Sequence, residues 1–324
     1  FSSDGGGTPV TGTETVTSPS ETFDNGGAGY ELSGLTDGTV TLTISLTDDA
    51  GNTGSDATAT ATKDADPPAG YTVSWDEALI NTAEASTASF TVSNAEIGTT
   101  INNSISSSGD GNTATVSNPI TVTSTTQVVT IDVSSLDDGV LTVEVSLTDA
   151  GGNTGGTVSD NAATLDQTAP SGYSVTIDQT DISAANQTAA SFTFAGAEVG
   201  ATYNYTLSNS EGGTDVTGSG TIATATDQIT GVDVSVLADG TITLSVTLTD
   251  PAGNEGSAAT DNVSKDATAP NFISVDDDGG DNSYKSGESL TIVADLGETG
   301  LTVTADLSVI NSGLSATAAM TDNA

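Results

Sequence analysis

The sequence predicts an all-β protein built from tandem β-sandwich domains. Three observations support this fold class: short segments alternate apolar residues with threonine or serine, no segment shows the apolar spacing of a helix, and whole blocks of sequence recur about every 100 residues. In segment 241–249, for example, every second residue from Ile242 to Leu248 is apolar. Such alternation is typical of a strand with one buried face, and β-branched threonine suits the solvated face.

Seven strands of this kind can be placed in residues 169–268, separated by turns such as Glu211–Gly213 and Ala238–Gly240. Seven short antiparallel strands in about 100 residues indicate an immunoglobulin-like sandwich. The chain has no cysteine for the disulfide of antibody domains, and its single Trp75 lies on a first strand, where we expect local packing. The predicted strands are 173–178, 189–195, 201–208, 215–223, 228–234, 240–249 and 257–265.

The repetition predicts the domain boundaries. The string LTDDAGNTG at 46–54 returns with small changes at 147–155 and at 248–256. Short proline-bearing linkers separate the copies, so we expect immunoglobulin-like domains in an elongated row whose neighbouring repeats are each other's partners. The predicted units are a partial repeat 1–66 that lacks its first strands, complete repeats 67–168 and 169–268, and a partial, divergent repeat 269–324.

Composition excludes several classes of function. The net charge of −41 comes from 44 acidic residues against three lysines, which excludes nucleic-acid binding because that requires cationic side chains. The absence of histidine and cysteine excludes Ser-His-Asp and Cys-His catalysis and zinc sites. Carboxylates are abundant, but they recur with the repeats instead of meeting in one cleft, so we expect no enzyme. No apolar run approaches the length of a membrane span, and we expect no membrane insertion.

Four sequence blocks carry a family resemblance: DQTAPSGYSVTIDQ, AEVGATYNY, LADGTITLSVTLTDPAGNEG and SKDATAP. They resemble the bacterial immunoglobulin-like repeats of very large secreted or cell-surface adhesins, a wording typical of Bacteroidota proteins, many of them exported by the type IX route. The resemblance covers 67–268 well and 1–66 in part, whereas 269–324 resembles a different immunoglobulin-like subtype. It implies an extracellular, non-catalytic stalk that holds a distal binding domain away from the cell in attachment, biofilm formation or gliding.

Two other functions stay open at this point. One is a subunit of an extracellular fibre or sheath, which would assemble through lateral contacts. The other is an array of carbohydrate-binding modules, which normally needs a platform of exposed aromatic rings. The chain has one Trp, six Tyr and six Phe, several of them at predicted core positions, so the second alternative is the weaker.

Recurring acidic residues predict calcium sites at the junctions between repeats. In a seven-strand sandwich the second-to-third-strand loop, the loop between the last two strands and the incoming linker meet at one pole. Oxygen ligands without nitrogen or sulfur favour Ca²⁺, and in the adhesins that the chain resembles such linker acids bind calcium and stiffen the rod. A plain hairpin turn is the alternative, because Asp, Asn and Gly satisfy turn geometry without a metal. The candidate ligands are Asp64, Asp66, Glu96, Asp149 and Asn153 at one junction, Asp166, Glu198, Asp250 and Asn254 at the next, Asp266 in the following linker, and Asp276 and Asp278 in the acidic segment 276–282.

Overall fold

The computed structural model describes residues 1–23, 25, 27–109, 113–114 and 120–270, together with the backbone of four short strands after residue 270. In these residues the fold is all-β, as predicted, with only a single 3₁₀ turn at Ala85–Thr87. The chain divides into two compact units. One consists of Phe1–Ala169 with Thr249–Glu255, and the other of Pro170–Leu248 with Gly256–Ala324.

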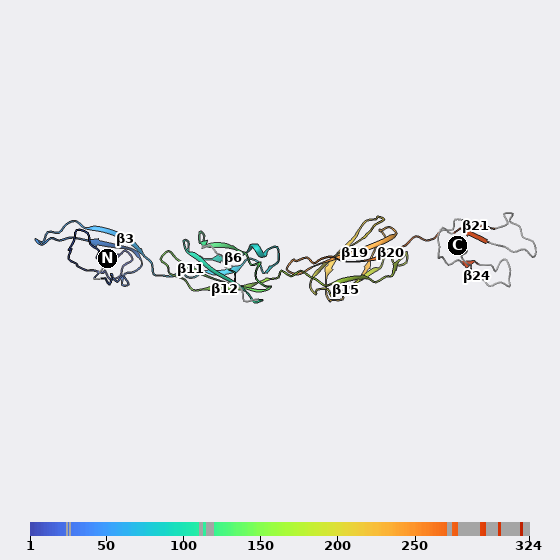
Figure 1. The fold of residues 1–324 in the computed structure, drawn as a ribbon, viewed down its shortest axis with the longest axis horizontal. Helices are drawn as coiled ribbons and strands as arrows, with labels where there is room; N and C mark the ends of the chain where they lie inside the picture. The colour runs from blue at the N-terminus through green and yellow to red at the C-terminus, as the bar shows by residue number, and fades with distance from the viewer. Residues whose placement is uncertain are drawn as a thin grey trace, which may run out of the picture. The chain divides into compact units, whose positions relative to one another are not determined.

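Residues 67–168, which we call repeat 2, form a β-sandwich. One sheet has the strand order β10-β6-β4, and the other has the order β5-β12-β11-β7-β8 with β9 beside β7. Figure 1 labels β6 of the first sheet and β11 and β12 of the second. All pairs are antiparallel except β5 and β12. The strands are β4 (Thr72–Trp75), β5 (Leu79–Ile80), β6 (Ala88–Ser93), β7 (Thr100–Ser107), β8 (Thr113–Ala114), β9 (Ile120–Thr121), β10 (Thr126–Ile131), β11 (Gly139–Thr148) and β12 (Val158–Leu165).

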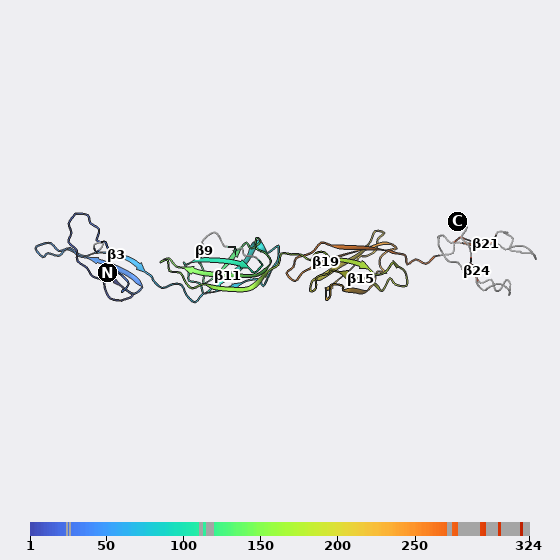
Figure 2. The ribbon, with the colours of Figure 1, turned by 60° about the horizontal axis from the view of Figure 1, so that its bottom comes forward.

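Residues 169–268, which we call repeat 3, have the same design. Their sheets run β13-β15-β18 and β14-β20-β19-β16-β17, so the labelled strands β15 and β19 belong to different sheets (Figure 2). All seven strands predicted from the alternation are present, with ends within two residues of those predicted. The short β14 was not predicted. The strands are β13 (Ser174–Ile177), β14 (Asp181–Ile182), β15 (Ala190–Ala195), β16 (Thr202–Asn209), β17 (Val216–Thr221), β18 (Gln228–Val232), β19 (Gly240–Thr249) and β20 (Ala259–Lys265).

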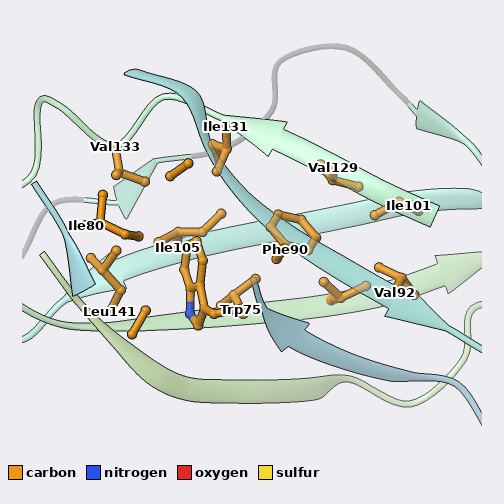
Figure 3. Packing of buried hydrophobic residues seen from close by; sticks show 14 of the residues in the cluster. Trp75, Ile80, Phe90, Val92, Ile101, Ile105, Val129, Ile131, Val133 and Leu141 are labelled. Atoms are coloured by element: carbon orange, nitrogen blue, oxygen red, sulfur yellow. The ribbon is translucent and has the colours of Figure 1, made fainter. Parts of the chain in front are cut away.

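The core of repeat 2 lies between its two sheets. Phe90 and Val92 of β6 and Leu141 of β11 are fully buried, because the alternation points every second side chain of each strand inward (Figure 3). Trp75 is 8% exposed and packs edge-on against Phe90, with ring centroids 6.1 Å apart, which confirms its role in packing. Repeat 3 has a separate core of the same kind around Phe192 and Phe194.

Residues 1–66, which we call repeat 1, contain a single three-stranded sheet in the order β1-β2-β3 among their described residues. The strands are β1 (Ser2–Ser3), β2 (Gly38–Ile44) and β3 (Ala57–Lys63). Beyond residue 270, the strand pairs are β21 (Ser274–Asp277) with β22 (Ile292–Asp295), and β23 (Thr304–Ala305) with β24 (Ala318–Ala319). Across the described stretches, no helix has the length and apolarity that crossing a membrane requires.

Candidate functional site: clasps that hold the linkers

The recurring Asp-x-x-x-Asn motif forms the same tight turn in all three copies. In repeat 1, Asp48 donates its backbone N–H to the carbonyl of Asn52, and its Oδ1 accepts the N–H of Asn52 at 2.8 Å. The Nδ2 of Asn52 donates to the other carboxylate oxygen at 2.9 Å. Both carboxylate oxygens are therefore hydrogen-bonded within the turn, which is how short Asx turns are stabilised. The same bonds join Asp149 to Asn153 and Asp250 to Asn254.

In two copies the asparagine also binds a linker. Asn153 donates from Nδ2 to the main-chain carbonyl of Asp64 at 3.0 Å, and Asn254 donates to that of Asp166 at 2.8 Å. The loop Thr249–Glu255 lies in the same compact unit as Asp166. Each asparagine thus shares its two amide hydrogens between its own turn and the linker. We call this pair of contacts the asparagine clasp.

The clasp of Asn254 is buried. Its Oδ1 accepts the backbone N–H of Thr82 at 3.0 Å and lies 2.9 Å from the Thr82 hydroxyl. Asp250 and Asn254 are only 5% and 7% exposed. Buried polar groups that lose their partners keep their full desolvation cost, so this network resists rearrangement.

A second aspartate holds each linker to the repeat that it leaves. Asp138 accepts the N–H of Gln167 at 2.8 Å and the hydroxyl of Thr168 at 2.6 Å. In repeat 3, Asp239 accepts the Thr268 hydroxyl, the Ala267 N–H and the ammonium of Lys265 at 2.9 Å. These donors, with the Thr268 hydroxyl foremost, hold the pKa of Asp239 far below its usual range.

The corresponding residue of repeat 1 makes the same kind of contacts. Asp37 accepts from Lys63 Nζ at 2.6 Å and from the Ala65 N–H at 2.9 Å. The Lys63 ammonium is the main cause of the lowered pKa of Asp37. Repeat 2 has Leu165 in place of the lysine, and the side chain of Asp138 is bonded among the described residues to Gln167 and Thr168. These Asp residues were not predicted as site residues, although the Asp-Gly pairs to which they belong recur with the same 101-residue period as the clasp.

A tyrosine and a glycine fix the base of the asparagine turn. Tyr71 donates its hydroxyl to the Gly156 carbonyl at 2.5 Å and accepts the N–H of Leu147 at 3.3 Å. Gly155, just after the turn, lies so close to the Pro68 carbonyl that a Cβ would overlap it. Tyr71 and Tyr173 lie 102 residues apart in the sequence, and neither was predicted as a site residue.

The other predicted ligands are dispersed. Asp166 uses its carboxylate to accept the Thr168 N–H at 3.1 Å, so only its main-chain carbonyl joins the clasp. Glu96 and Glu198 are exposed in the loops after β6 and β15, and their main-chain carbonyls accept loop N–H groups. Asp266 accepts from Thr268, and Asp64 accepts from Asp66; all three acids are exposed. Asp276 lies on β21, whose side chains are outside the described residues, as is all of Asp278.

Calcium binding stays a prediction. Within the ranges that the structure describes, no three acidic side chains are gathered so that they could hold a metal ion. The oxygens of Asp250 face N–H donors from Gly253 and Asn254, and the amide oxygen of Asn254 faces Thr82. A cation at this place would have to displace those hydrogen bonds, so the arrangement as it stands does not fit a calcium site.

No protein-family model and no curated protein sequence matches the chain. Among solved structures, the tetra-tandem repeat in the extending region of a large adhesion protein is 27% identical, with 83% of this chain and 72% of that chain covered and a TM-score of 0.32. A structure from a 1.5-MDa bacterial ice-binding adhesin is 23% identical, with coverage of 73% and 77% and a TM-score of 0.39. The FN1–FN3 domains of chicken CNTN1 are 11% identical, with coverage of 70% and 76% and a TM-score of 0.33. With TM-scores below 0.5, these likenesses carry no argument about function.

Proposed function

We propose that the chain is a non-catalytic stalk segment of a bacterial cell-surface adhesin, in which immunoglobulin-like repeats project a distal binding domain for attachment, biofilm formation or gliding. The observation that carries the proposal is the hydrogen bond from Asn254 Nδ2 to the carbonyl of Asp166. It is repeated between Asn153 and Asp64. A stalk must keep its linkers in a fixed conformation, and a contact that recurs at two successive linkers serves that purpose.

The linker 166–168 supports this reading because it is held from two sides. Asp166 donates its N–H to the Ile80 carbonyl at 2.9 Å, and Asp138 holds the next two residues. Asn254 then binds the carbonyl of Asp166. A linker whose main chain is bonded in this way loses the freedom of a flexible tether, which would otherwise be the default for a short polar segment. We infer that these clasps, without a bound ion, supply the stiffness of the stalk.

The test measures a distance distribution across one linker. Because the chain has no cysteine, spin labels on introduced Ser159→Cys and Thr243→Cys would be unique. The distribution should be narrow in the full chain and should broaden in Asn254→Ala. Asn52→Ala is the matched control, since Asn52 makes the same turn without a linker partner among the described residues, and it should leave the distribution narrow.

Two outcomes would contradict the proposal. One is a wild-type distribution as broad as that of Asn254→Ala. The other is a wild-type distribution that is narrow only with millimolar calcium and broad in chelator. This result would indicate that calcium at the predicted sites, and not the clasps, stiffens the linker.

A further inference from the structure

The chain contains three residues that a trypsin-like protease can recognise. Such proteases bind the cationic side chain of lysine or arginine in an acidic pocket, and the chain has three lysines and no arginine. Lys63 and Lys265 are the last residues of β3 and β20, so each lies directly before a linker. Lys285 is outside the described residues. Exposed connecting segments are the preferred places for proteolytic cleavage, so the surroundings of the two described lysines decide whether the linkers can be cut.

Each of these two lysines is paired with a carboxylate of its own repeat. Lys63 Nζ lies 2.6 Å from Asp37 Oδ1, and Lys265 Nζ lies 2.9 Å from Asp239 Oδ1. The side chain of Lys265 is only 4% exposed, and that of Lys63 is 22% exposed. The carboxylate of the repeat therefore holds the ammonium as the acidic pocket of a protease would hold it, and the protease has to compete with a charge-assisted hydrogen bond inside the fold.

The peptide bond after Lys265 is held in the fold as well. Lys265 pairs with Gly240 of β19 on one side and with Ile182 of β14 on the other. The N–H of Asp266, which belongs to this peptide bond, donates to the Ile182 carbonyl at 2.8 Å. The linker residues that follow are bonded to Asp239. Cleavage after Lys265 therefore requires local opening of the end of β20 in addition to release of the lysine side chain.

We propose that Asp37 and Asp239 shield these lysines from trypsin-like proteases, so that resistance to such enzymes is a second function of the aspartates that hold the linkers. This function does not depend on what the chain binds or projects. At Lys265 the shield combines the buried ion pair with the doubly paired backbone. Lys63 has the weaker shield because its side chain is more exposed, and we expect it to be cut before Lys265.

The test is limited digestion with trypsin of the full chain carrying Lys285→Gln, which leaves Lys63 and Lys265 as targets. Mass spectrometry of the fragments gives a rate for each site, and peptides of residues 58–68 and 260–270 give the unshielded rates. Lys265 should be cut about a hundredfold or more slowly in the chain than in its peptide, because the protease cleaves only the open fraction. Asp239→Ala should speed cleavage at Lys265 by about tenfold or more and leave the rate at Lys63 unchanged. Asp37→Ala should do the reverse.

Digestion with chymotrypsin separates shielding from a general loss of fold. This protease recognises aromatic side chains, and Phe192 and Phe194 are fully buried in the core of repeat 3, so cleavage after them reports unfolding of that repeat. Asp239→Ala should leave this cleavage slow. Asp233→Ala is the matched control for trypsin, because Asp233 is an exposed aspartate of the same repeat that accepts the Ser235 N–H, and it should leave the rate at Lys265 unchanged.

Three outcomes would overturn the proposal. The first is cleavage of the folded chain at Lys265 as fast as cleavage of the peptide. The second is a rate at Lys265 that Asp239→Ala does not change. The third is equal acceleration of trypsin and chymotrypsin cleavage by Asp239→Ala, which would show that the aspartate stabilises the whole repeat and does not shield the lysine.

Discussion

At the residue scale, Asn254 is distinguished by using every polar atom of its side chain. Nδ2 donates to Asp166 and Asp250, while Oδ1 accepts from Thr82. An amide is the side chain that fits this site, because it presents two donors to acceptors on one side and an acceptor to a donor on the other. The role of Asn254 therefore depends on its amide group, which binds the linker and Thr82 in addition to closing the turn.

Asn254→Asp separates the hydrogen-bonded clasp from the predicted calcium site. A carboxylate at this position faces the carbonyl of Asp166 and the carboxylate of Asp250, so the free energy of unfolding should fall by about 2–4 kcal/mol. Thermal unfolding with chelator and with calcium measures the effect, and Asn52→Asp, at an exposed turn, is the milder control. Recovery of stability by calcium would contradict the clasp, because an added carboxylate strengthens a calcium site.

Acid should weaken the turn of Asp149. The Asn153 amide is the main cause of the lowered pKa of Asp149. A group whose pKa is lower in the folded state adds stability above its unfolded pKa of about 4, and that contribution is lost as the pH falls through the folded value. The melting temperature should therefore fall as the pH is lowered from about 4 to about 2, below the usual pKa of Asp. Asp149→Asn should lose less on acidification, and an equal loss in both proteins would contradict this assignment.

At the scale of elements, the stem of the asparagine turn depends on a close approach of two backbone segments. Gly155→Ala would drive a Cβ into the Pro68 carbonyl, whereas Gly54→Ala in repeat 1 would meet nothing nearer than the Leu46 carbonyl at 3.8 Å. Gly155→Ala should lower the melting temperature and raise amide exchange around residues 149–156. Gly54→Ala should be neutral or slightly stabilising. Equal effects of the two substitutions would show that the contact with Pro68 is unimportant.

The strands could be predicted from sequence because their signal is local. Segment 241–249 alternates without a break, and β19 spans Gly240–Thr249. The short β5 and β14 could not be predicted, since two residues carry no period. Each forms a strand only because it lies parallel to the last strand of its repeat.

The site could be predicted only as a set of recurring residues. Asp250 and Asn254 recur with a fixed period, and that signal is visible in the sequence. The linker partner of Asn254 is the main-chain carbonyl of a residue 88 positions earlier, and a carbonyl has no sequence signature. The recurring acidic side chains predict a cation, a prediction that stays untested, and in the structure Asp250 orients the amide of Asn254. Asp138 was missed because Asp-Gly is also an ordinary turn signal.

At the scale of the whole molecule, the excess of negative charge is the main influence on stability that we consider. The net charge is −41, and the ion pairs among the described residues are Lys63–Asp37 and Lys265–Asp239. Repulsion between like charges destabilises a compact state and is screened by salt. Added sodium chloride should therefore raise the melting temperature by several degrees. Calcium chloride at matched ionic strength is the control. A much larger rise with calcium would indicate specific binding, and no rise with either salt would contradict the role of repulsion.

The asparagine clasp binds a main-chain carbonyl, and this choice bears on how such a chain evolves. Neither Asp64 nor Asp166 contributes its side chain to the bond with the next repeat's asparagine. A linker can therefore change its side chains and still be held, provided that its backbone follows the same path. If one whole repeat replaced another, its asparagine would meet the same main-chain acceptor in the linker without a compensating substitution.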